Sequence, residues 1–329
     1  MQPWLRATSA FAAVVTTVLT PALPLRTVSD IPLGGKSPRF DYQTIDPTTG
    51  RLYIAHEGDG QVIVFDLRHR RVARRIGGLA DVHGVLVAPA IHRLYATATA
   101  LHQLVVIDTR TDQIVARHRA GVVPDGIAYD AASGEVYISD ERPAGAVIAA
   151  DARSGRVLET IALGGSAGNV QYDRIAHRVV VGVETRDQLA VIGPSTHAIT
   201  RRVPVPGCRA NHSLLVDPRQ RLLLVGCSGN GRLVVLDADS FRELGHVDGA
   251  GHVDVLALDP GTHRAYSSSE DGIVTVLQLR DGQAPRVLGQ KRLAPRAHSI
   301  VVDPATHLVY LPLGRAGRAS VLRIMRPTH

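Results

Sequence analysis

The sequence contains little of several residue types on which whole classes of function depend. Aromatic residues make up only 4% of its 329 residues, and there are two cysteines, two methionines and one tryptophan. Single-stranded nucleic acid is bound by stacking bases on aromatic side chains, and no basic run here is interleaved with aromatics. A core must be built from Val, Leu, Ile and Ala, which the 45% hydrophobic content allows.

Motifs of common nucleotide and cofactor sites are also missing. No P-loop, no His-Glu-x-x-His pair and no Cys-x-x-Cys-His haem attachment sequence occurs in the chain. The run Gly229-Asn230-Gly231 is typical of a turn between strands. We therefore expect no organic cofactor.

Lysine is nearly absent from a chain that is basic overall. Lys36 and Lys291 are the only lysines among 37 basic residues, the net charge is +7 and the pI is about 9.8. A basic balance can attract nucleic acid, acidic membranes or anions. Here the arginines are scattered along the chain, so we interpret them as a solvated surface and expect no nucleic-acid partner.

The N-terminal residues differ from the rest of the chain. Arg6 precedes a short apolar stretch, Ala10–Leu19, which is followed by the small-residue run Thr20-Pro21-Ala22. This order indicates a signal peptide over residues 1–22, because the apolar stretch is too short to span a membrane. We expect a periplasmic or secreted protein whose mature domain covers residues 23–329 and has no membrane span after cleavage.

Export would expose the two cysteines of the chain to an oxidising compartment. Cys208 precedes one predicted strand and Cys227 follows the next, so the two lie at the same end of an antiparallel pair. An oxidising compartment favours a disulfide between them. A thiolate metal site is the alternative interpretation.

A repeat of 42–44 residues runs through the chain seven times. Each copy has an anchor position, usually Asp, ahead of a short apolar run; the anchors are Asp46, Ala88, Asp130, Asp173, Asp217, Asp259 and Asp303. Seven residues later come Tyr53, Tyr95, Tyr137, Val180, Leu224, Tyr266 and Tyr310. A period of this size with several strands per unit predicts the blades of a β-propeller.

Each of the first six repeats supplies four predicted strands. In the first they cover Tyr42–Ile45, Arg51–Ala55, Gln61–Asp66 and Val72–Ile76. The seventh supplies only three, at His298–Asp303, His307–Leu311 and Ser320–Met325. We expect Arg26–Leu33 to complete the last blade and close the ring, which removes free sheet edges. The predicted fold is an all-β, seven-bladed propeller of four-stranded antiparallel blades, one domain and a monomer.

The repeats resemble those of the YVTN family of β-propeller proteins. That family places a Tyr-Val-Thr-Asn-like strand after an Asp-Pro-x-Thr-like turn. The matching runs are Tyr53-Ile54-Ala55-His56, Tyr95-Ala96-Thr97-Ala98, Tyr137-Ile138-Ser139-Asp140, Tyr266-Ser267-Ser268-Ser269 and Tyr310-Leu311-Pro312-Leu313. Repeats four and five lack the tyrosine. The resemblance covers residues 26–329 and implies an exported propeller without an assigned reaction; related propellers include lactonases, lyases and haem d1 domains.

Charged and imidazole side chains recur five residues before the anchors. These positions are Asp41, His83, Asp125, Gly168, His212, Asp254 and His298. Propeller symmetry brings equivalent positions toward one axis, and Asp or His is costly to bury unpaired. Three interpretations are open: a divalent metal site, metal-free acid–base catalysis, or hydrogen bonds to backbone amides of adjacent blades. The histidines of the anchor turns, such as His92 and His307, are interpreted as turn residues.

The predicted loops between the second and third strands add an acidic rim. They contain His56, Glu57, Asp140, Glu141, Glu184, Glu270 and Asp271. An acidic mouth on a basic protein favours a cation or a cationic ligand.

The leading hypothesis is therefore a binding protein for a small molecule or protein partner at this face. Its predicted metal ligands are His83, His212 and His298, with Asp41, Asp125 and Asp254 as further ligands or as orienting carboxylates. The alternative is a metal-assisted lactonase or lyase in which His212 or His298 moves a proton.

Overall fold

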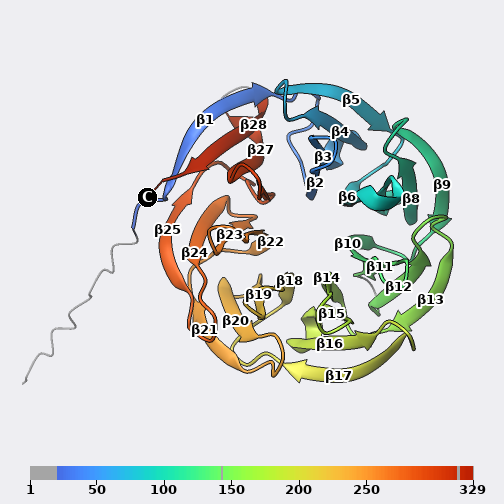
Figure 1. The fold of residues 1–329 in the computed structure, drawn as a ribbon, viewed down its shortest axis with the longest axis vertical. Helices are drawn as coiled ribbons and strands as arrows, with labels where there is room; N and C mark the ends of the chain where they lie inside the picture. The colour runs from blue at the N-terminus through green and yellow to red at the C-terminus, as the bar shows by residue number, and fades with distance from the viewer. Residues whose placement is uncertain (1–20, 142–143, 317–318, 329) are drawn as a thin grey trace, which may run out of the picture.

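The computed structural model describes residues 21–141, 144–316 and 319–328. Its strands form seven four-stranded antiparallel sheets arranged around a central axis (Figure 1). The seven-bladed all-β propeller predicted from the repeat is confirmed. Within the described ranges, none of the helices has the length and hydrophobicity of a membrane span. The predicted signal peptide lies almost entirely outside these ranges and stays a prediction.

Each blade has four strands between the axis and the rim. The innermost strands are β2 (Gln43–Asp46), β6 (Val82–Ala88), β10 (Pro124–Asp130), β14 (Ala167–Asp173), β18 (Asn211–Asp217), β22 (Val253–Asp259) and β26 (Val301–Asp303). The second strands are β3 (Arg51–His56), β7 (Arg93–Ala98), β11 (Glu135–Asp140), β15 (Arg178–Val183), β19 (Leu222–Cys227), β23 (Arg264–Ser269) and β27 (Leu308–Ala316).

The third strands are β4 (Gln61–Asp66), β8 (Gln103–Asp108), β12 (Ala146–Asp151), β16 (Gln188–Gly193), β20 (Arg232–Asp237), β24 (Ile273–Gln278) and β28 (Ala319–Pro327). The outermost strands are β5 (Arg71–Gly77), β9 (Gln113–Arg119), β13 (Val157–Ala162), β17 (Ala198–Pro204), β21 (Glu243–Val247), β25 (Arg286–Arg292) and β1 (Leu25–Pro32). Four short 3-10 helices connect strands: η1 (Glu57–Asp59), η2 (Pro89–Ile91), η3 (Thr99–Leu101) and η4 (Glu184–Arg186).

The core lies between adjacent blades and is carried by the second and third strands. Both faces of these strands are buried, so they read as continuous apolar runs rather than as alternating ones. The repeated tyrosines Tyr53, Tyr95, Tyr137 and Tyr266 are fully buried there. Outer strands such as β9 alternate between exposed and half-buried residues, because one of their faces meets solvent.

The anchor turns fold as their sequence predicts. The carboxylate of Asp46 accepts a hydrogen bond from the amide of Thr48 at 2.8 Å, and Asp217 does the same for Arg219 at 2.9 Å. His92 and His307 end such turns with φ of 53° and 58°, in the left-handed region that a turn terminus requires. Their interpretation as turn residues is confirmed.

Four arginines that begin second strands join neighbouring blades. Arg51 donates to the carbonyl of Thr109 at 3.0 Å, and Arg93 donates to that of Arg153 at 3.3 Å. Arg178 and Arg264 bond in the same way to Ala238 and Thr328. The prediction of a solvated arginine surface was wrong for these four. A planar guanidinium can donate several bonds at fixed angles, which a lysine cannot.

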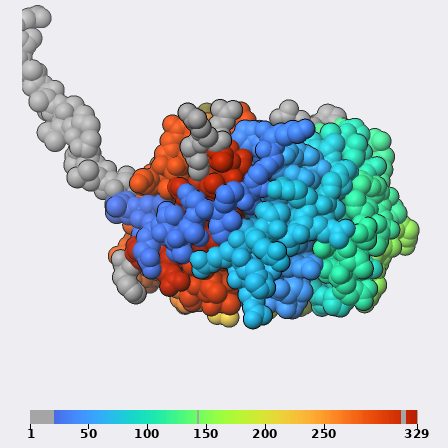
Figure 2. Space-filling view, turned by 90° about the horizontal axis from the view of Figure 1, so that it is seen from above, coloured from blue at the N-terminus to red at the C-terminus, as the bar shows by residue number. Residues whose placement is uncertain are grey.

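The ring closes between the two ends of the chain. β1 pairs with β28 from Leu25 opposite Pro327 to Pro32 opposite Val321, so the last blade contains strands from both ends. The side chain of Arg323 holds Asp30 with a 2.8 Å hydrogen bond. In the space-filling view the blue N-terminal strand packs directly against the red C-terminal strands (Figure 2). The predicted closure is confirmed.

The predicted disulfide is present in the fifth blade. Cys208 and Cys227 are joined at an S–S distance of 2.03 Å, with a sequence separation of 19 residues. Both are buried in the apolar cluster between the fourth and fifth blades. The thiolate metal site is therefore excluded, because neither sulfur is free.

Replacing both cysteines by alanine is expected to lower the free energy of unfolding by about 3 kcal/mol, because a loop of this length loses its cross-link in the unfolded chain. Thermal denaturation of the oxidised protein and the double variant measures the loss. Reduced wild-type protein is the control and should melt close to the variant. Equal melting temperatures for the oxidised protein and the variant would contradict the prediction.

Candidate metal centre

Six charged or imidazole residues reach the axis because of local irregularities at the starts of the innermost strands. His83, Asp125, His212 and Asp254 each lie where the register shifts against the second strand. Such a β-bulge redirects a side chain out of the regular ladder. Asp41 and His298 lie just before β2 and β26.

The fourth blade has glycine at the equivalent position for a steric reason. A Cβ on Gly168 would lie 2.6 Å from the carbonyl oxygen of His212 in the next blade. A side chain there would therefore clash with the backbone that presents His212. This explains why the ring has six functional side chains rather than seven.

Hydroxyl groups fix the backbone of the ring between blades. Thr97 donates to the carbonyl of Asp125 at 2.8 Å, and Ser268 donates to that of His298 at 2.6 Å. Ser213 and Ser299 make the same bond to Asp254 and Asp41. Each hydroxyl comes from the preceding blade. The bonds use the backbone carbonyls, so the carboxylates and imidazoles remain available to one another.

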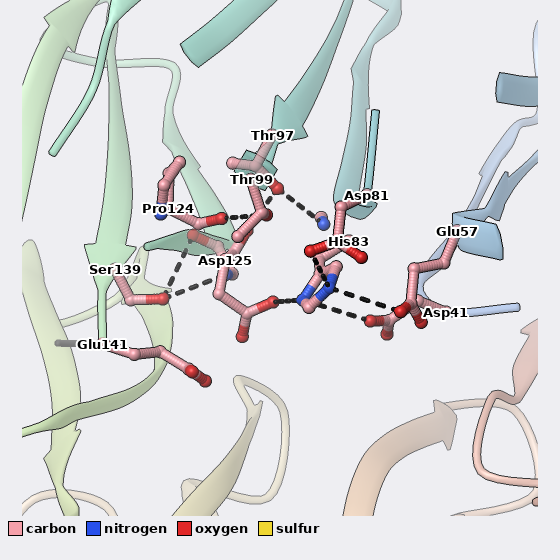
Figure 3. A network of polar contacts seen from close by, with 12 residues as sticks. Asp41, Glu57, Asp81, His83, Thr97, Thr99, Pro124, Asp125, Ser139 and Glu141 are labelled. Carbon is pink, nitrogen blue, oxygen red and sulfur yellow. Dashed lines mark hydrogen bonds and ion pairs between the residues drawn. The ribbon is translucent and has the colours of Figure 1, made fainter. Parts of the chain in front are cut away.

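His83 lies between carboxylates from three directions (Figure 3). Its Nδ1 is 3.3 Å from Asp125 and 3.6 Å from Asp41, and its Nε2 is 3.7 Å from both Glu57 and Asp81. These distances exceed those of strong charge-assisted hydrogen bonds. His83 therefore has many acidic neighbours but no close partner.

His212 and His298 share one carboxylate. The Nε2 of His212 is 3.1 Å from Asp254, and the Nδ1 of His298 contacts the other oxygen of the same residue. The second nitrogen of His212 is 2.6 Å from Glu184. The Nδ1 of His298 also lies 3.3 Å from Glu270, while its Nε2 is buried and has no hydrogen-bond partner among the described residues.

All six predicted ring residues line one cavity of about 180 Å³, together with Arg39, Tyr42, Glu141 and Glu270. We call this cavity the funnel. Three groups of side chains in it each place three donor atoms within 4.8 Å of one another. The groups are Asp41–Glu57–His83, Asp41–Asp254–His298 and Asp125–Glu141–His212. The structure thus brings together every residue that the sequence proposed as a ligand.

Two buried atoms of the funnel show that a bound group would fit there. The Oδ1 of Asp41 and the Nε2 of His298 have no hydrogen-bond partner in the described structure, although the residues are only 5% and 2% exposed. An unsatisfied buried polar atom costs about 1–3 kcal/mol. Both atoms belong to residues of the same group, Asp41–Asp254–His298, so one cation could satisfy both.

The electrostatics of the funnel place protons on the imidazoles. Burial alone would lower the pKa of His83, but Asp125 and the other acidic neighbours raise it to about 10. Burial is likewise outweighed at His298, where Asp254 raises the pKa to about 9. At His212, Asp254 and Glu184 overcome burial and hold the pKa well above its ordinary value.

The carboxylates of the funnel divide into two kinds. Burial and neighbouring carboxylates raise the pKa of Asp41 and of Glu141 to about 8. Burial also acts on Asp254, but hydrogen bonds from His212 and His298 hold its pKa below the usual range. The funnel therefore carries more negative groups than its own imidazoles neutralise, which is the setting that attracts a cation.

Among the six ring side chains, no hydrogen bond to a backbone amide occurs in the described structure; their polar contacts are with one another, with the glutamates and with Asp81. The interpretation of the ring as hydrogen-bonding to backbone amides of adjacent blades therefore finds no such bond, although ion pairs such as His83–Asp125 do join adjacent blades.

The sequence predicted an acidic rim, and four of its glutamates contact histidines of the funnel. They are Glu57, Glu141, Glu184 and Glu270. Each lies eleven residues after its anchor, so the repeat itself carried this signal. By contrast Asp140 caps the amides of Val122 and Val123.

Two further funnel residues were missed. Arg39 pairs with Glu57 and lies 3.9 Å from Glu270, and Tyr42 lines the funnel. Both lie in the segment before β2. Arg39 has a counterpart in the seventh repeat, Arg296, which also lies seven residues before its anchor.

One run, Gly164–Gly168, matches the Gly-x-Ser-x-Gly pattern of serine hydrolases. In those enzymes the serine lies on a turn from strand to helix, whereas this run leads into β14. The hydroxyl of Ser166 lies 3.4 Å from a carboxylate oxygen of Glu184, and none of its described contacts is with an imidazole. The run therefore does not form a nucleophile site.

No protein-family model matches the chain, and no curated protein matches its sequence. Solved structures do match the fold. A chain of the Kuenenia stuttgartiensis hydrazine synthase has a TM-score of 0.76 at 14% identity, covering 88% of this chain and 97% of its own. The WD40 repeats of RRP9 match with a TM-score of 0.76 at 12% identity, covering 94% of this chain and 99% of their own. A chain of the mitotic checkpoint complex matches with a TM-score of 0.73 at 12% identity, covering 100% of this chain and 98% of its own. These likenesses establish a seven-bladed β-propeller, while the resemblance to the YVTN family rests on the repeats alone.

Proposed function

We propose that this chain is an exported, YVTN-type propeller that binds a divalent metal ion in its funnel and presents the ion to a ligand at that face. The observation that carries the proposal is the convergence of three imidazoles and several carboxylates around unsatisfied buried atoms of Asp41 and His298. The predicted signal peptide and the disulfide support the exported location.

The donor set narrows the class of ion. Imidazole nitrogens and carboxylate oxygens suit Zn²⁺, Mn²⁺, Fe²⁺, Ni²⁺ or Cu²⁺. No described cysteine is free to contribute a thiolate, which disfavours soft ions such as Cu⁺. The hydroxyl bonds to the ring carbonyls hold the donors in place before an ion arrives.

Elemental mass spectrometry tests the proposal on mature protein purified without chelator or affinity tag. We expect at least one ion per chain after incubation with Mn²⁺ or Zn²⁺, and less than a tenth of that in a variant with His83, His212 and His298 replaced by alanine.

The matched control for this measurement replaces the exposed histidines His69, His246 and His252, which also pair with carboxylates. It should bind as the wild type does, and circular dichroism should show that both variants fold. Absence of metal from the wild type under every ion tested would refute the proposal.

A second candidate function is metal-assisted lactone hydrolysis or elimination. It is favoured by the space left beside the donors, about 180 Å³, and by the position of Arg39, which lines that space and can hold a carboxylate. A bound dication would supply polarisation of a substrate carbonyl. His212, with carboxylates at both nitrogens, is placed to move a proton. Turnover of a lactone panel that His212→Ala abolishes without lowering metal content would support this function over binding alone.

A further inference from the structure

We infer that the funnel binds two divalent cations, bridged by the carboxylate of Asp41. The inference rests on the proposed function and adds the number of ions and the bridging residue. Asp41 is the one residue that belongs to two of the three donor groups, with Glu57 and His83 on one side and with Asp254 and His298 on the other. Two-metal sites share ligands in this way.

The two oxygens of Asp41 are placed differently. Oδ2 lies 3.6 Å from the Nδ1 of His83, whereas Oδ1 is buried without a partner. A bridging carboxylate gives one oxygen to each ion. Asp41 thus has one oxygen near the His83 group and one uncommitted oxygen available to the group with Asp254 and His298.

The imidazoles of these two groups are available as ligands. The Nε2 of His298 has no hydrogen-bond partner in the described structure, and both nitrogens of His83 are 3.3 Å or more from their nearest carboxylates. A cation at the Nε2 of His298 or at either nitrogen of His83 therefore displaces no strong hydrogen bond.

The third group differs, because both nitrogens of His212 are already engaged. They lie 2.6 Å from Glu184 and 3.1 Å from Asp254. An ion at Asp125–Glu141–His212 would have to break one of these bonds. His212 instead orients Asp254 toward the shared site, which is the role that a carboxylate–imidazole pair commonly has beside a metal.

Acidic groups outnumber permanently basic ones around the funnel. Seven carboxyl groups face it, against one guanidinium, that of Arg39; the carboxyl groups are Asp41, Glu57, Asp125, Glu141, Glu184, Asp254 and Glu270. This excess favours cations over anions at both groups of donors.

Arg39 supports the same arrangement from outside. It pairs with Glu57, a member of the first group, and lies 3.9 Å from Glu270, which contacts His298 of the second. One guanidinium thereby holds carboxylates beside both proposed ions.

Titration with Mn²⁺ tests the inference, with bound ions counted by elemental mass spectrometry and the coupling between them read by electron paramagnetic resonance. We expect two ions per chain and a spin-coupled spectrum for the wild type. Asp41→Asn keeps the shape but removes the bridge, so it should bind at most one ion and give an uncoupled spectrum. Asp30→Asn, the matched control on the outermost strand of the closing blade, should keep two coupled ions.

The outcomes separate the two proposals. One uncoupled ion in the wild type would overturn the bridged pair and leave a metal-binding funnel intact. Two coupled ions in Asp41→Asn would also overturn the bridge, and two uncoupled ions in the wild type would place them in separate groups. No bound ion in the wild type would instead refute the proposed function itself. A melting curve for Asp41→Asn shows whether a loss of ions comes from the missing bridge or from unfolding.

Discussion

Cation uptake by the funnel is expected to strengthen about tenfold per pH unit for each proton that the ion displaces, and two displaced protons would give about 10⁴-fold between pH 6 and pH 8. The pKa of His83 is raised to about 10 and that of His298 to about 9, so both are protonated across this range. A metal ligand must be the neutral imidazole. Uptake therefore releases protons, and raising the pH removes the competition.

The affinity for a cation is expected to rise with pH because carboxylates face each imidazole and raise its pKa. His83 is surrounded by Asp41, Glu57, Asp81 and Asp125, and each favours the imidazolium form. Carboxylates likewise surround the other two ring histidines. Asp41, with a pKa raised to about 8, adds a further proton that an ion displaces. Asp254 adds none, because its lowered pKa keeps it ionised over the whole range.

Isothermal titration with Mn²⁺ at pH 6, 7 and 8, in buffers of different ionisation enthalpy, measures the affinity and the number of protons released. His83→Asn cannot be protonated there, so it should lower the slope of log affinity against pH by about one. An affinity that does not change over this range would show that the ion binds only carboxylates that are already ionised, and the expectation would be wrong.

Deletion of residues 26–33 is expected to destabilise the whole ring rather than to fray one end. The deleted segment supplies nearly all of β1, the outer strand of the closing blade. It also carries Leu33, which is 1% exposed in a cluster with Phe40 and Tyr310. Burial of one such leucine contributes about 2 kcal/mol, and the deletion leaves β28 with an unpaired edge.

Limited proteolysis and thermal melting measure the effect of this deletion. The deleted variant should be digested throughout its length at temperatures at which the wild type is resistant. Asp30→Asn is the control: it removes only the partly exposed ion pair with Arg323 and should cost less than about 1 kcal/mol. A deletion variant as resistant as the wild type would refute the role of β1 in closing the ring.

The sequence predicted the fold because a repeated period carries the same information seven times. It predicted the ring for a related reason: equivalent positions such as His83 and Asp125 must converge when the repeats close. The strand bounds were less accurate where the backbone is irregular. The predicted strand from His298 begins only at Val301, because His298 lies outside the ladder and points into the funnel.

What the sequence did not predict depends on contacts between blades. Ser299 donates to the carbonyl of Asp41 across 258 residues, and no local pattern marks such a pair. Arg39 matches Arg296 in the seventh repeat, but the pattern does not show that Arg39 pairs with Glu57. The arginines that join blades, such as Arg51, look like surface residues in sequence because their partners are backbone carbonyls.

The closure of the ring also determines when the protein can finish folding. Asp30 and Arg323, which meet in the closing blade, are 293 residues apart in the chain. The ribosome makes β1 before any other strand of the ring and β28 last, so β1 waits without its partner while the other blades are synthesised. Contacts over such separations form slowly because the intervening chain must be ordered first. Closure therefore waits until β28 has been made, and a chain that lacked β28 would have six complete blades and a seventh in which β1 has no strand to pair with.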